Sequence, residues 1–544
     1  MLKDASTLPD GDTLCYDICI IGSGAAGITL AHQLRGSGPT AKTVVVLEGS
    51  LLYNQNKVAP EVEETLQRTG THPEPEAAGY DIRALHRFSD PVAQQLYQGA
   101  VSAEMQAIDS GFLTRSRVRV YGGTTNCWGG RTRPLAAIDF DRSDLNRWMV
   151  WPITRDDLES YYAVAQRYCS LEGFAPDAYD RPEWWVNRAT RPLEVLGQGT
   201  GEMRSVVLTD LNTEGPGVPD GARDFQVVWG PEVVAAPNID LFRNANVKVL
   251  HHRAGSITHA TCATIDYGAV PPKCGTTFTV EAKQFVVAAG GIESVRLLLA
   301  SGLHDRPGTL GRFFMIHPLN TEAVKFKGPR AAAGVRNFYS YPFPQLRDQR
   351  YPPYLFAALT PTDDALRKNG IGNIRAQVGF DATGGGRIDL NWEQAPSPDN
   401  RVLLSNDPTD VDLLGNRKVF LDWRHRPLDQ RTVEVGGGLV MEELRKLNLL
   451  DDAYKIDLNV RQPGDHHMGA TRMSATDTNG YVDANCRVHH MANLFIASSS
   501  VFPTSGYANP TLTIIALAVR LADHLKRPRG ADAEEPPRAE AAAV

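Results

Sequence analysis

The feature that most constrains the fold is a glycine motif between two apolar segments near the start of the chain. Gly22, Gly24 and Gly27 form a GxGxxG pattern, which follows the apolar run 16–21 and opens a segment with helical spacing. A second apolar run, 43–47, comes after that segment. A strand, a helix and a strand within about 30 residues make a βαβ unit. This order predicts an α/β fold with a Rossmann-type domain that binds a dinucleotide.

Each residue of the motif has its own expected task. Gly22 permits the tight turn, Gly24 lets backbone N–H groups approach a pyrophosphate, and Gly27 allows close packing of helix on strand. Glu48 ends the second apolar run, about 20 residues further on, where its carboxylate would accept hydrogen bonds from ribose hydroxyls. The motif alone does not distinguish FAD from NAD, and a glycine-rich helix start in any α/β sheet remains the alternative. The residues expected at the cofactor here are Gly22, Ser23, Gly24, Ala25, Gly27 and Glu48.

Composition narrows the function classes. The 544 residues carry a formal net charge of −7 and have no basic block, which argues against a nucleic-acid partner but leaves a cationic substrate open. Two or three domains are expected for this length. No apolar run reaches the length of a membrane-spanning helix, so no membrane partner is expected.

Cysteine usage and the chain ends indicate a compartment. The N-terminus lacks the features of a secretory signal. The seven cysteines are scattered, odd in number and without CxxC spacing, which excludes a disulfide framework and offers no zinc site. We therefore expect a cytoplasmic protein that needs no metal. Residues 527–544 are rich in Pro, Ala and charge, and we expect a disordered tail there.

The rest of the chain alternates between two kinds of pattern. Buried-strand patterns occur at 247–250 and 284–289, and helical patterns at 293–300 and 511–526, whereas 321–430 alternates and favours an antiparallel sheet. Thr154 is placed to cap a helix whose first turn carries acidic residues. Residues 50–110 are polar without a clear period and suggest a long excursion.

Four further segments follow the glycine motif in order. They are the glycine-rich loop 122–126, the strand and helix 285–300 followed by 311–318, the histidine motif 465–473, and the segment 493–513. Together with the glycine motif, they resemble the glucose–methanol–choline (GMC) family of flavin oxidoreductases. Segments 151–153, 392–396, 401–402 and 421–423 are similar to the branch that contains pyranose oxidases and bacterial glycoside oxidases.

The resemblance implies two domains. An FAD-binding domain is expected from residues 1–135, 240–320 and 460–526, and a substrate domain with an antiparallel β-sheet from 136–239 and 321–459. The implied function is an FAD-dependent alcohol oxidoreductase that oxidises a hydroxyl of a sugar, glycoside or aminosugar-containing natural product to a ketone or aldehyde. A non-sugar alcohol substrate, a non-redox lyase on the same scaffold and a nucleotide-binding protein without turnover are the alternatives.

The resemblance also places the catalytic pair. His466 takes the position of the base, and a neutral imidazole suits this task because histidine titrates near pH 7. Asn509, just before the last helix, takes the position of its partner, where an amide can orient the substrate oxygen. Hydride then passes to flavin N5, and the electrons go to oxygen or another acceptor. Oligomeric state is not predicted.

Further cofactor contacts follow from the same resemblance. They are expected at Gly122, Gly123, Thr124, Asn126, Cys127, Val249, Ala289, Pro510 and Thr511. Some relatives attach FAD covalently through a histidine in the loop that here holds Cys127. A noncovalent flavin is expected, with a thioether to Cys127 as the alternative.

Several other residues remain ambiguous. His467, His489 and His490 are expected to be structural, with His467 alternatively supporting the site, and His317 is expected close behind the site. The aromatic run 338–356 and the pair Glu393 and Gln394 could contact a sugar, or could merely pack a loop and a sheet edge.

Overall fold

The computed structural model describes residues 1–51, 92–171, 175, 177–187, 194–196, 201–210, 224–305, 307–327, 331–339, 354–381, 383–460 and 462–527. Much of the expected excursion at 50–110, most of the aromatic run and the tail beyond residue 527 lie outside these ranges.

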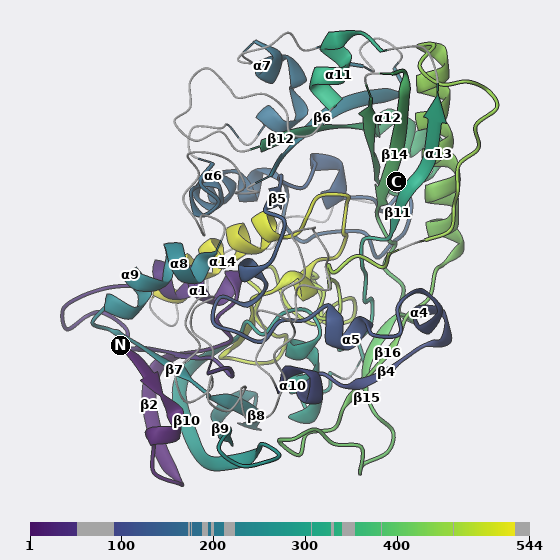
Figure 1. Ribbon diagram of the computed structural model, residues 1–544. Helices are drawn as coiled ribbons and strands as arrows, with labels where there is room; N and C mark the ends of the chain where they lie inside the picture. The colour runs from purple at the N-terminus through teal and green to yellow at the C-terminus, as the bar shows by residue number, and fades with distance from the viewer. Residues whose placement is uncertain are drawn as a thin grey trace.

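Eight strands within the described ranges form the larger sheet, in the lower part of Figure 1. Its order is β1 (Leu2–Asp4), β7 (Ile239–Arg243), β3 (Val44–Leu47), β2 (Asp12–Ile21), β10 (Lys273–Val287), β9 (Ser256–Asp266) and β8 (Asn246–Arg253), and β17 (Leu494–Ile496) pairs with β10. β2 is parallel to both β3 and β10, and β10, β9 and β8 form an antiparallel meander. The two expected strands at 16–21 and 43–47 are therefore confirmed as neighbours in a Rossmann-type sheet.

Helices cover this sheet. α1 (Ala25–Gln33) lies on β2 and β3, and α14 (Thr511–Lys526) packs beside α1. α6 (Glu159–Tyr168) packs on α14, while α9 (Gly230–Ala235) packs on α1 and β7 next to α8 (Phe225–Val228). α10 (Glu293–Ala300) packs on β8. The bounds of α10 and α14 are those expected from the sequence.

A six-stranded sheet forms the upper part of Figure 1. Its order is β11 (Leu319–Lys327), β14 (Gly385–Trp392), β13 (Ile374–Phe380), β12 (Tyr354–Pro361), β6 (Met203–Asp210) and β5 (Arg131–Thr132), all antiparallel. α13 (Pro427–Lys446) and α11 (Ala333–Tyr339) pack on this sheet, and α12 (Asp363–Asn369) follows β12. The antiparallel sheet expected within 321–430 is confirmed.

Smaller elements join the two sheets. β15 (Arg401–Leu404), β16 (Val419–Asp422) and β4 (Gly99–Val101) form a three-stranded sheet. Short helices are α3 (Ala93–Leu96), α4 (Ala103–Ile108), α5 (Phe112–Arg115) and α7 (Pro182–Val186). Single 3-10 turns are η1 (Ala5–Thr7), η3 (Gly123–Asn126), η4 (Ala137–Phe140), η5 (Asp156–Leu158), η6 (Ala178–Asp180) and η7 (Ser499–Val501).

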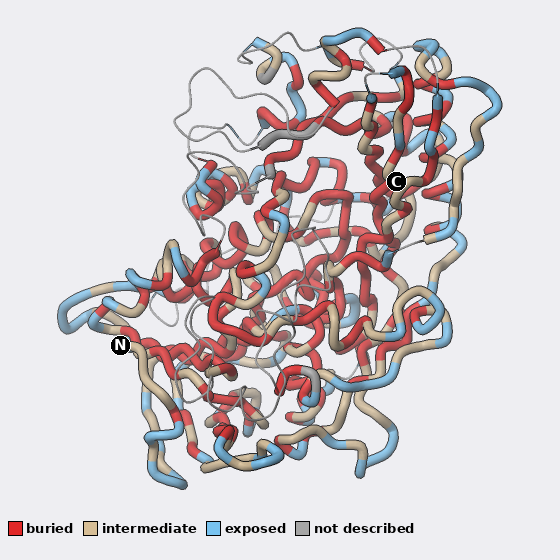
Figure 2. Tube along the Cα trace, in the orientation of Figure 1, coloured by how far each residue is buried: buried red, intermediate tan, exposed pale blue. Residues whose placement is uncertain are grey.

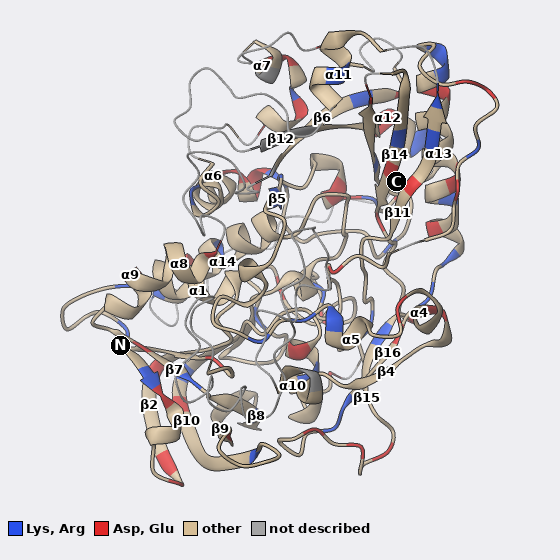
Figure 3. Ribbon diagram, in the orientation of Figure 1, with Lys and Arg blue, Asp and Glu red and all other residues tan. Residues whose placement is uncertain are grey.

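Burial is deepest where the sheets and their helices meet, as the red interior of Figure 2 shows. Residues 18–21 of β2 and all of β3 are buried, as expected for parallel strands covered on both faces. Basic and acidic residues are interspersed along the ribbon drawn in Figure 3. Among the described helices, none combines the length and apolar character needed to cross a bilayer.

Candidate active site

A cavity of about 1840 Å³ lies between the two sheets. The strands of the upper sheet that line it are β5, β11, β13 and β14. Around the lower sheet, its lining comes from residues 21–26, 47–49, 116–120, 245–247, 288–293, 464–467, 497–499 and 509–511. Segments that are hundreds of residues apart in the chain thus meet around one space.

The glycine motif lies at one end of this cavity. Gly22 has φ +102°, and a Cβ there would lie 2.7 Å from the carbonyl oxygen of Ala288. A Cβ on Gly27 would collide with the carbonyl oxygen of Gly22, so this glycine permits the close packing of α1. A Cβ on Gly24 would meet nothing within 4 Å and would enter the cavity. Gly24 therefore leaves the backbone open to a ligand.

The start of α1 suits an anion. Gly24 is its N-cap, and no side chain within the described structure caps the first turn. Gly24, Ala25 and Ala26 all line the cavity. The N–H groups of a helix's first turn lack partners inside the helix and carry partial positive charge. The residues present therefore fit a pyrophosphate.

Glu48 is held rigidly at the end of β3. It is 7% exposed and lines the cavity beside Ser23. One carboxylate oxygen accepts the N–H of Ser50 at 2.9 Å, and the other accepts the hydroxyl of Ser23. This placement fits an acid that receives hydrogen bonds from a ribose.

Two buried arginines at the cavity were missed by the sequence analysis. Arg117 donates to the Tyr97 carbonyl oxygen at 2.7 Å and pairs with Glu293 at 3.3 Å. Arg119 donates to the carbonyl oxygen of Gly49 and to the Asn246 side chain. Both side chains are buried. The signal was the spacing of arginines at every second position before the glycine-rich loop, which places them on one side of an extended segment.

The glycine-rich loop packs against the dinucleotide motif. The N–H of Gly122 donates to the carbonyl oxygen of Ser23 at 3.1 Å. Gly123, Thr124 and Cys127 line the cavity, whereas Gly122 and Asn126 are not among its lining residues. Asn126 instead donates to the carbonyl oxygens of Tyr121 and Gly123 at 3.0 and 2.8 Å.

Of the remaining residues expected to contact the cofactor, three line the cavity and one does not. Ala289, Pro510 and Thr511 line the cavity. Val249 is not among the lining residues; its neighbour Val247 is, because β8 is irregular between these two positions.

His466 and Asn509 lie next to each other at the cavity. Nε2 of His466 lies 3.3 Å from Nδ2 of Asn509. Nδ1 of His466 lies 2.8 Å from Nδ1 of His317, whose Nε2 lies 3.1 Å from the Ser505 carbonyl oxygen. His317 is fully buried behind His466, in line with its expected supporting place.

Electrostatics favour a neutral His466. Burial lowers its pKa well below 6.5, and the positive or potentially positive neighbours His317, Arg375 and His467 lower it further. Burial likewise lowers the pKa of His317 to about 4. Because both rings are neutral at pH 7, His466 has a free lone pair with which to accept a proton.

Arg375 on β13 is a third arginine at the cavity that the sequence did not indicate. Its guanidinium donates to Oδ1 of Asn509 at 3.4 Å and lines the cavity. Burial, followed by the charges of Arg131 and Arg133, lowers its pKa to about 9, so it remains cationic at pH 7. A strand of the upper sheet thereby orients the amide next to His466.

Glu393 and Gln394 are fully or almost fully buried and are not among the cavity-lining residues. Glu393 accepts the N–H groups of Asn373 and Gly506, each at 2.9 Å. It faces Asp139, and burial followed by the negative charge of Glu393 raises the pKa of Asp139 to about 7. Neither of the two roles expected for this pair, sugar contact or sheet edge, describes this placement.

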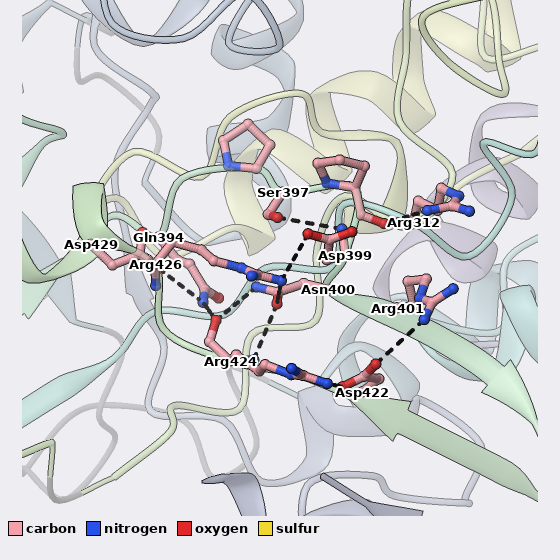
Figure 4. Close-up of polar contacts among 12 residues, drawn as sticks. Arg312, Gln394, Ser397, Asp399, Asn400, Arg401, Asp422, Arg424, Arg426 and Asp429 are labelled. Carbon is pink, nitrogen blue, oxygen red and sulfur yellow. Dashed lines mark hydrogen bonds and ion pairs between the residues drawn. The ribbon is translucent and has the colours of Figure 1, made fainter.

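Gln394 belongs to a polar network that includes Arg424 and Asp429, part of which Figure 4 shows. Its Oε1 accepts the indole N–H of Trp423 at 2.8 Å and the N–H of Ile316 at 3.1 Å, next to His317. Its Nε2 donates toward Asp429 and the Arg424 carbonyl oxygen. The network holds the backbone that carries His317.

The other candidates lie apart from the reacting end. His467 faces Ser116, with 2.9 Å between Nε2 and Oγ, and burial lowers its pKa to about 3. His490 pairs with Asp477 on the surface at 2.6 Å. Of the aromatic run, Phe338 and Tyr339 are buried, and Tyr339 lines the cavity. Tyr341, Phe343 and Tyr351, and the side chains of Tyr354 and Phe356, lie outside the described residues.

The chain is similar to known oxidoreductases. Residues 386–518 match the model of the GMC oxidoreductase family. The 2-methyl-1,2-propanediol dehydrogenase of Mycolicibacterium austroafricanum is 24% identical over 77% of this chain and 82% of its own length. The C-glycoside 3-oxidase of Microbacterium trichothecenolyticum is 26% identical over 94% of this chain and 96% of its own.

A solved structure shares the fold. The R554A variant of formate oxidase from Aspergillus oryzae RIB40 superposes with a TM-score of 0.57 and 17% identity, covering 95% of this chain and 99% of that one. That structure concerns the effect of the R554A mutation on FAD modification in formate oxidase.

Proposed function

We propose that the chain, whose residues 386–518 match the model of the GMC oxidoreductase family, is an FAD-dependent enzyme that oxidises a hydroxyl of a sugar or glycoside to a ketone or aldehyde. The observation that carries this proposal is the pairing of a neutral His466 with Asn509 at the cavity that also holds the glycine motif. The residue proposed to accept the proton and the residues proposed to bind the dinucleotide line the same cavity.

The cradle and the catalytic pair divide the work. Gly24, Ala25 and Glu48 would hold the pyrophosphate and ribose, and Gly123, Thr124, Ala289, Pro510 and Thr511 would line the ring system. When bound, FAD supplies the acceptor for the hydride that leaves the carbinol carbon. Nε2 of His466 takes the hydroxyl proton. Nδ2 of Asn509 donates to the same oxygen and stabilises the negative charge that develops on it.

The sheet face opposite the cradle supports a sugar. Three cross-strand pairs of β13 and β14 line the cavity: Arg375 with Asn391, Gln377 with Asp389, and Gly379 with Arg387. The alternate residues Ala376 and Val378 are buried on the other side. Oδ1 of Asn391 is buried and has no partner among the described residues. Amide, carboxylate and guanidinium groups suit the many hydroxyls of a sugar ring.

A non-sugar alcohol is the second candidate. The similarity to a protein named as a propanediol dehydrogenase favours it, since that relative's name refers to a small diol. The same base and amide would serve either substrate.

The proposal also assigns the bounds of the two domains, a cytoplasmic location and an electron acceptor for the reduced flavin. Residues 1–135, 240–320 and 460–526 would bind FAD noncovalently, and 136–239 with 321–459 would bind substrate. Helices α6, α8 and α9 of the second set nevertheless pack on α1 and α14. All seven cysteines lie in the described ranges and none forms a disulfide, which supports a cytoplasmic protein. Oxygen or another carrier would reoxidise the flavin.

The test is an absorption spectrum before and after acid precipitation, then anaerobic mixing with methyl glucosides, aryl C-glucosides and propane-1,2-diol. We expect yellow colour in the supernatant after precipitation and bleaching by a glycoside. His466→Ala should keep its flavin and slow bleaching by about 10²–10⁴-fold, whereas His489→Ala should not slow it. Bleaching only by the diol would contradict the sugar proposal, and a yellow pellet would indicate a covalent link with Cys127 as the first suspect.

A further inference from the structure

The hydrogen bonds around His466 form one continuous chain across the site. It runs from the guanidinium of Arg375 to Asn509, His466, His317 and the carbonyl oxygen of Ser505. Its successive distances are 3.4, 3.3, 2.8 and 3.1 Å. The four side chains come from separate segments of the polypeptide. Arg375 lies on β13, Asn509 in the loop before α14, His466 in the histidine motif and His317 in the loop before β11.

Each of the two groups at the ends of this hydrogen-bonded chain can act only as a donor or only as an acceptor. An arginine guanidinium has donors and no acceptor, and a backbone carbonyl oxygen has no proton to donate. The Asn509 atom that faces Arg375 must therefore be its oxygen, which leaves the amide Nδ2 to donate to His466. The His317 nitrogen that faces Ser505 must be an N–H, which leaves its Nδ1 as an acceptor when the ring is neutral.

We propose that this chain fixes the tautomer of His466, with His317 as the positioning residue. His466 carries its proton on Nδ1, which donates to Nδ1 of His317, and its lone pair lies on Nε2, toward Asn509 and the cavity. Both neighbours of His466 require this same assignment. The inference rests on the proposed function only for its catalytic meaning, because the tautomers themselves are properties of the resting protein.

The consequence for catalysis is a base that needs no change of tautomer. When a substrate hydroxyl takes the place of the Asn509 donor at Nε2, Nε2 can accept its proton, and the cation so formed keeps its Nδ1–H bond to His317. Because Oδ1 of Asn509 accepts from Arg375, it is Nδ2, a hydrogen-bond donor, that faces the substrate position. With the opposite tautomer, Nε2 would carry a proton and could not act as the base.

His317 is held in the orientation that this role requires. The N–H of Ile316, one residue before it, is bonded to Gln394 at 3.1 Å. A Cβ on Gly464 would collide with the carbonyl oxygen of His317, so the segment that leads to His466 passes directly over its backbone. The charged or titratable groups near the two rings are Arg375 on β13 and His467 in the histidine motif.

The test is 15N NMR of the holoenzyme labelled at its histidine rings, at pH 7.5 and without substrate. The resonances of His466 and His317 are assigned by their loss in His466→Ala and His317→Leu. We expect opposite tautomers on the two rings: Nδ1–H on His466 and Nε2–H on His317. A proton on Nε2 of His466, or on both nitrogens of either ring, would overturn the proposal.

The variant separates positioning from mere packing. In His317→Leu, His466 loses the acceptor for Nδ1–H, and we expect part of its population to shift to Nε2–H. An unchanged His466 signal would remove His317 from the role. His489→Leu, which deletes a half-buried ring away from the cavity, should leave the signal unchanged. None of these readouts depends on which alcohol is oxidised, so a failed substrate panel and a failed tautomer assignment are distinguishable.

Discussion

Three neighbouring histidines differ because their surroundings differ. His466 opens onto the cavity and is half-buried, whereas His317 and His467 are buried on either side of it. The ring of His467 contacts Phe112 edge-on, with 5.4 Å between centroids, and bonds to Ser116. Burial keeps the three rings neutral at pH 7, and of the three His466 and His467 line the cavity.

The neutral burial of His467 predicts a pH-dependent stability. Its pKa is about 3 in the folded protein against 6.5 in the unfolded chain. Between these values the unfolded chain binds a proton that the folded protein does not, so the free energy of unfolding falls as pH drops below about 6.5. The loss is about 1.4 kcal/mol per pH unit.

The matched variant is His467→Gln, which keeps a hydrogen-bonding group but does not titrate. We expect it to be less stable than the parent at pH 7.5, because it packs less well against Phe112. This deficit should shrink by about 1.4 kcal/mol per pH unit between pH 6 and 4. Urea unfolding of both proteins at several pH values measures it, and a pH-independent difference would contradict neutral burial.

At the residue scale, the position of a residue within a sequence motif predicted its place at the site, whereas its residue type alone did not. His466 and Asn509 were predictable because they lie inside short patterned segments. His317 was expected near the site, but its bond to His466 spans 149 residues of sequence. Arg375 lies in a strand of alternating pattern. It is opposite Asn391 because β13 pairs with β14 in one particular register, and no local sequence pattern indicates that pairing.

Element boundaries follow local chemistry closely. Thr154 was expected to cap a helix, and its hydroxyl oxygen accepts the N–H of Asp157 at 3.3 Å, while the Asp157 carboxylate accepts the N–H of Thr154 at 2.8 Å. The turn that follows is η5, and α6 begins only at Glu159. The cap was therefore predictable, whereas the insertion of a 3-10 turn between cap and helix was not.

α13 contains three successive glycines, whose surroundings differ sharply. A Cβ on Gly436 would lie 2.6 Å from Cγ2 of Ile374 on β13, whereas a Cβ on Gly438 would meet nothing within 4 Å. Gly438 is exposed and Gly436 is buried. Glycine costs a helix interior about 1 kcal/mol relative to alanine.

These surroundings predict opposite effects for two alanine substitutions in one helix. Gly438→Ala should stabilise the protein by about 0.5–1 kcal/mol. Gly436→Ala should destabilise it by about 1–3 kcal/mol, because the added methyl overpacks the contact with β13. Thermal unfolding of the two variants is the measurement, and equal stabilisation by both would show that α13 does not approach the sheet this closely.

At the scale of the whole molecule, the cavity is the common boundary of both sheets. Its walls include residues from β2 near the N-terminus and from α14 near the C-terminus. A ligand that fills it contacts segments from along most of the chain, so its binding is coupled to the stability of both sheets.

Removal of FAD should therefore lower the melting temperature of the whole protein, and added FAD should restore it. Free FAD at 100 times its Kd stabilises the folded state by about 2.7 kcal/mol. Differential scanning calorimetry of the holo and flavin-free protein measures the change, with NAD as the control ligand. A melting temperature that does not respond to FAD, or responds equally to NAD, would contradict an FAD cradle at the glycine motif.

The sequence by itself determined the βαβ start and the bounds of α10 and α14, and it predicted His466 and Asn509 as the catalytic pair. Each of these depends on the spacing of neighbouring residues, which is a local property. Only the tertiary structure decided that Arg375, His317 and Ser505 meet at His466, and that Glu393 and Gln394 lie behind the cavity. Those contacts join residues that are far apart in the chain, and their geometry depends on strand register and on the packing of one sheet against the other.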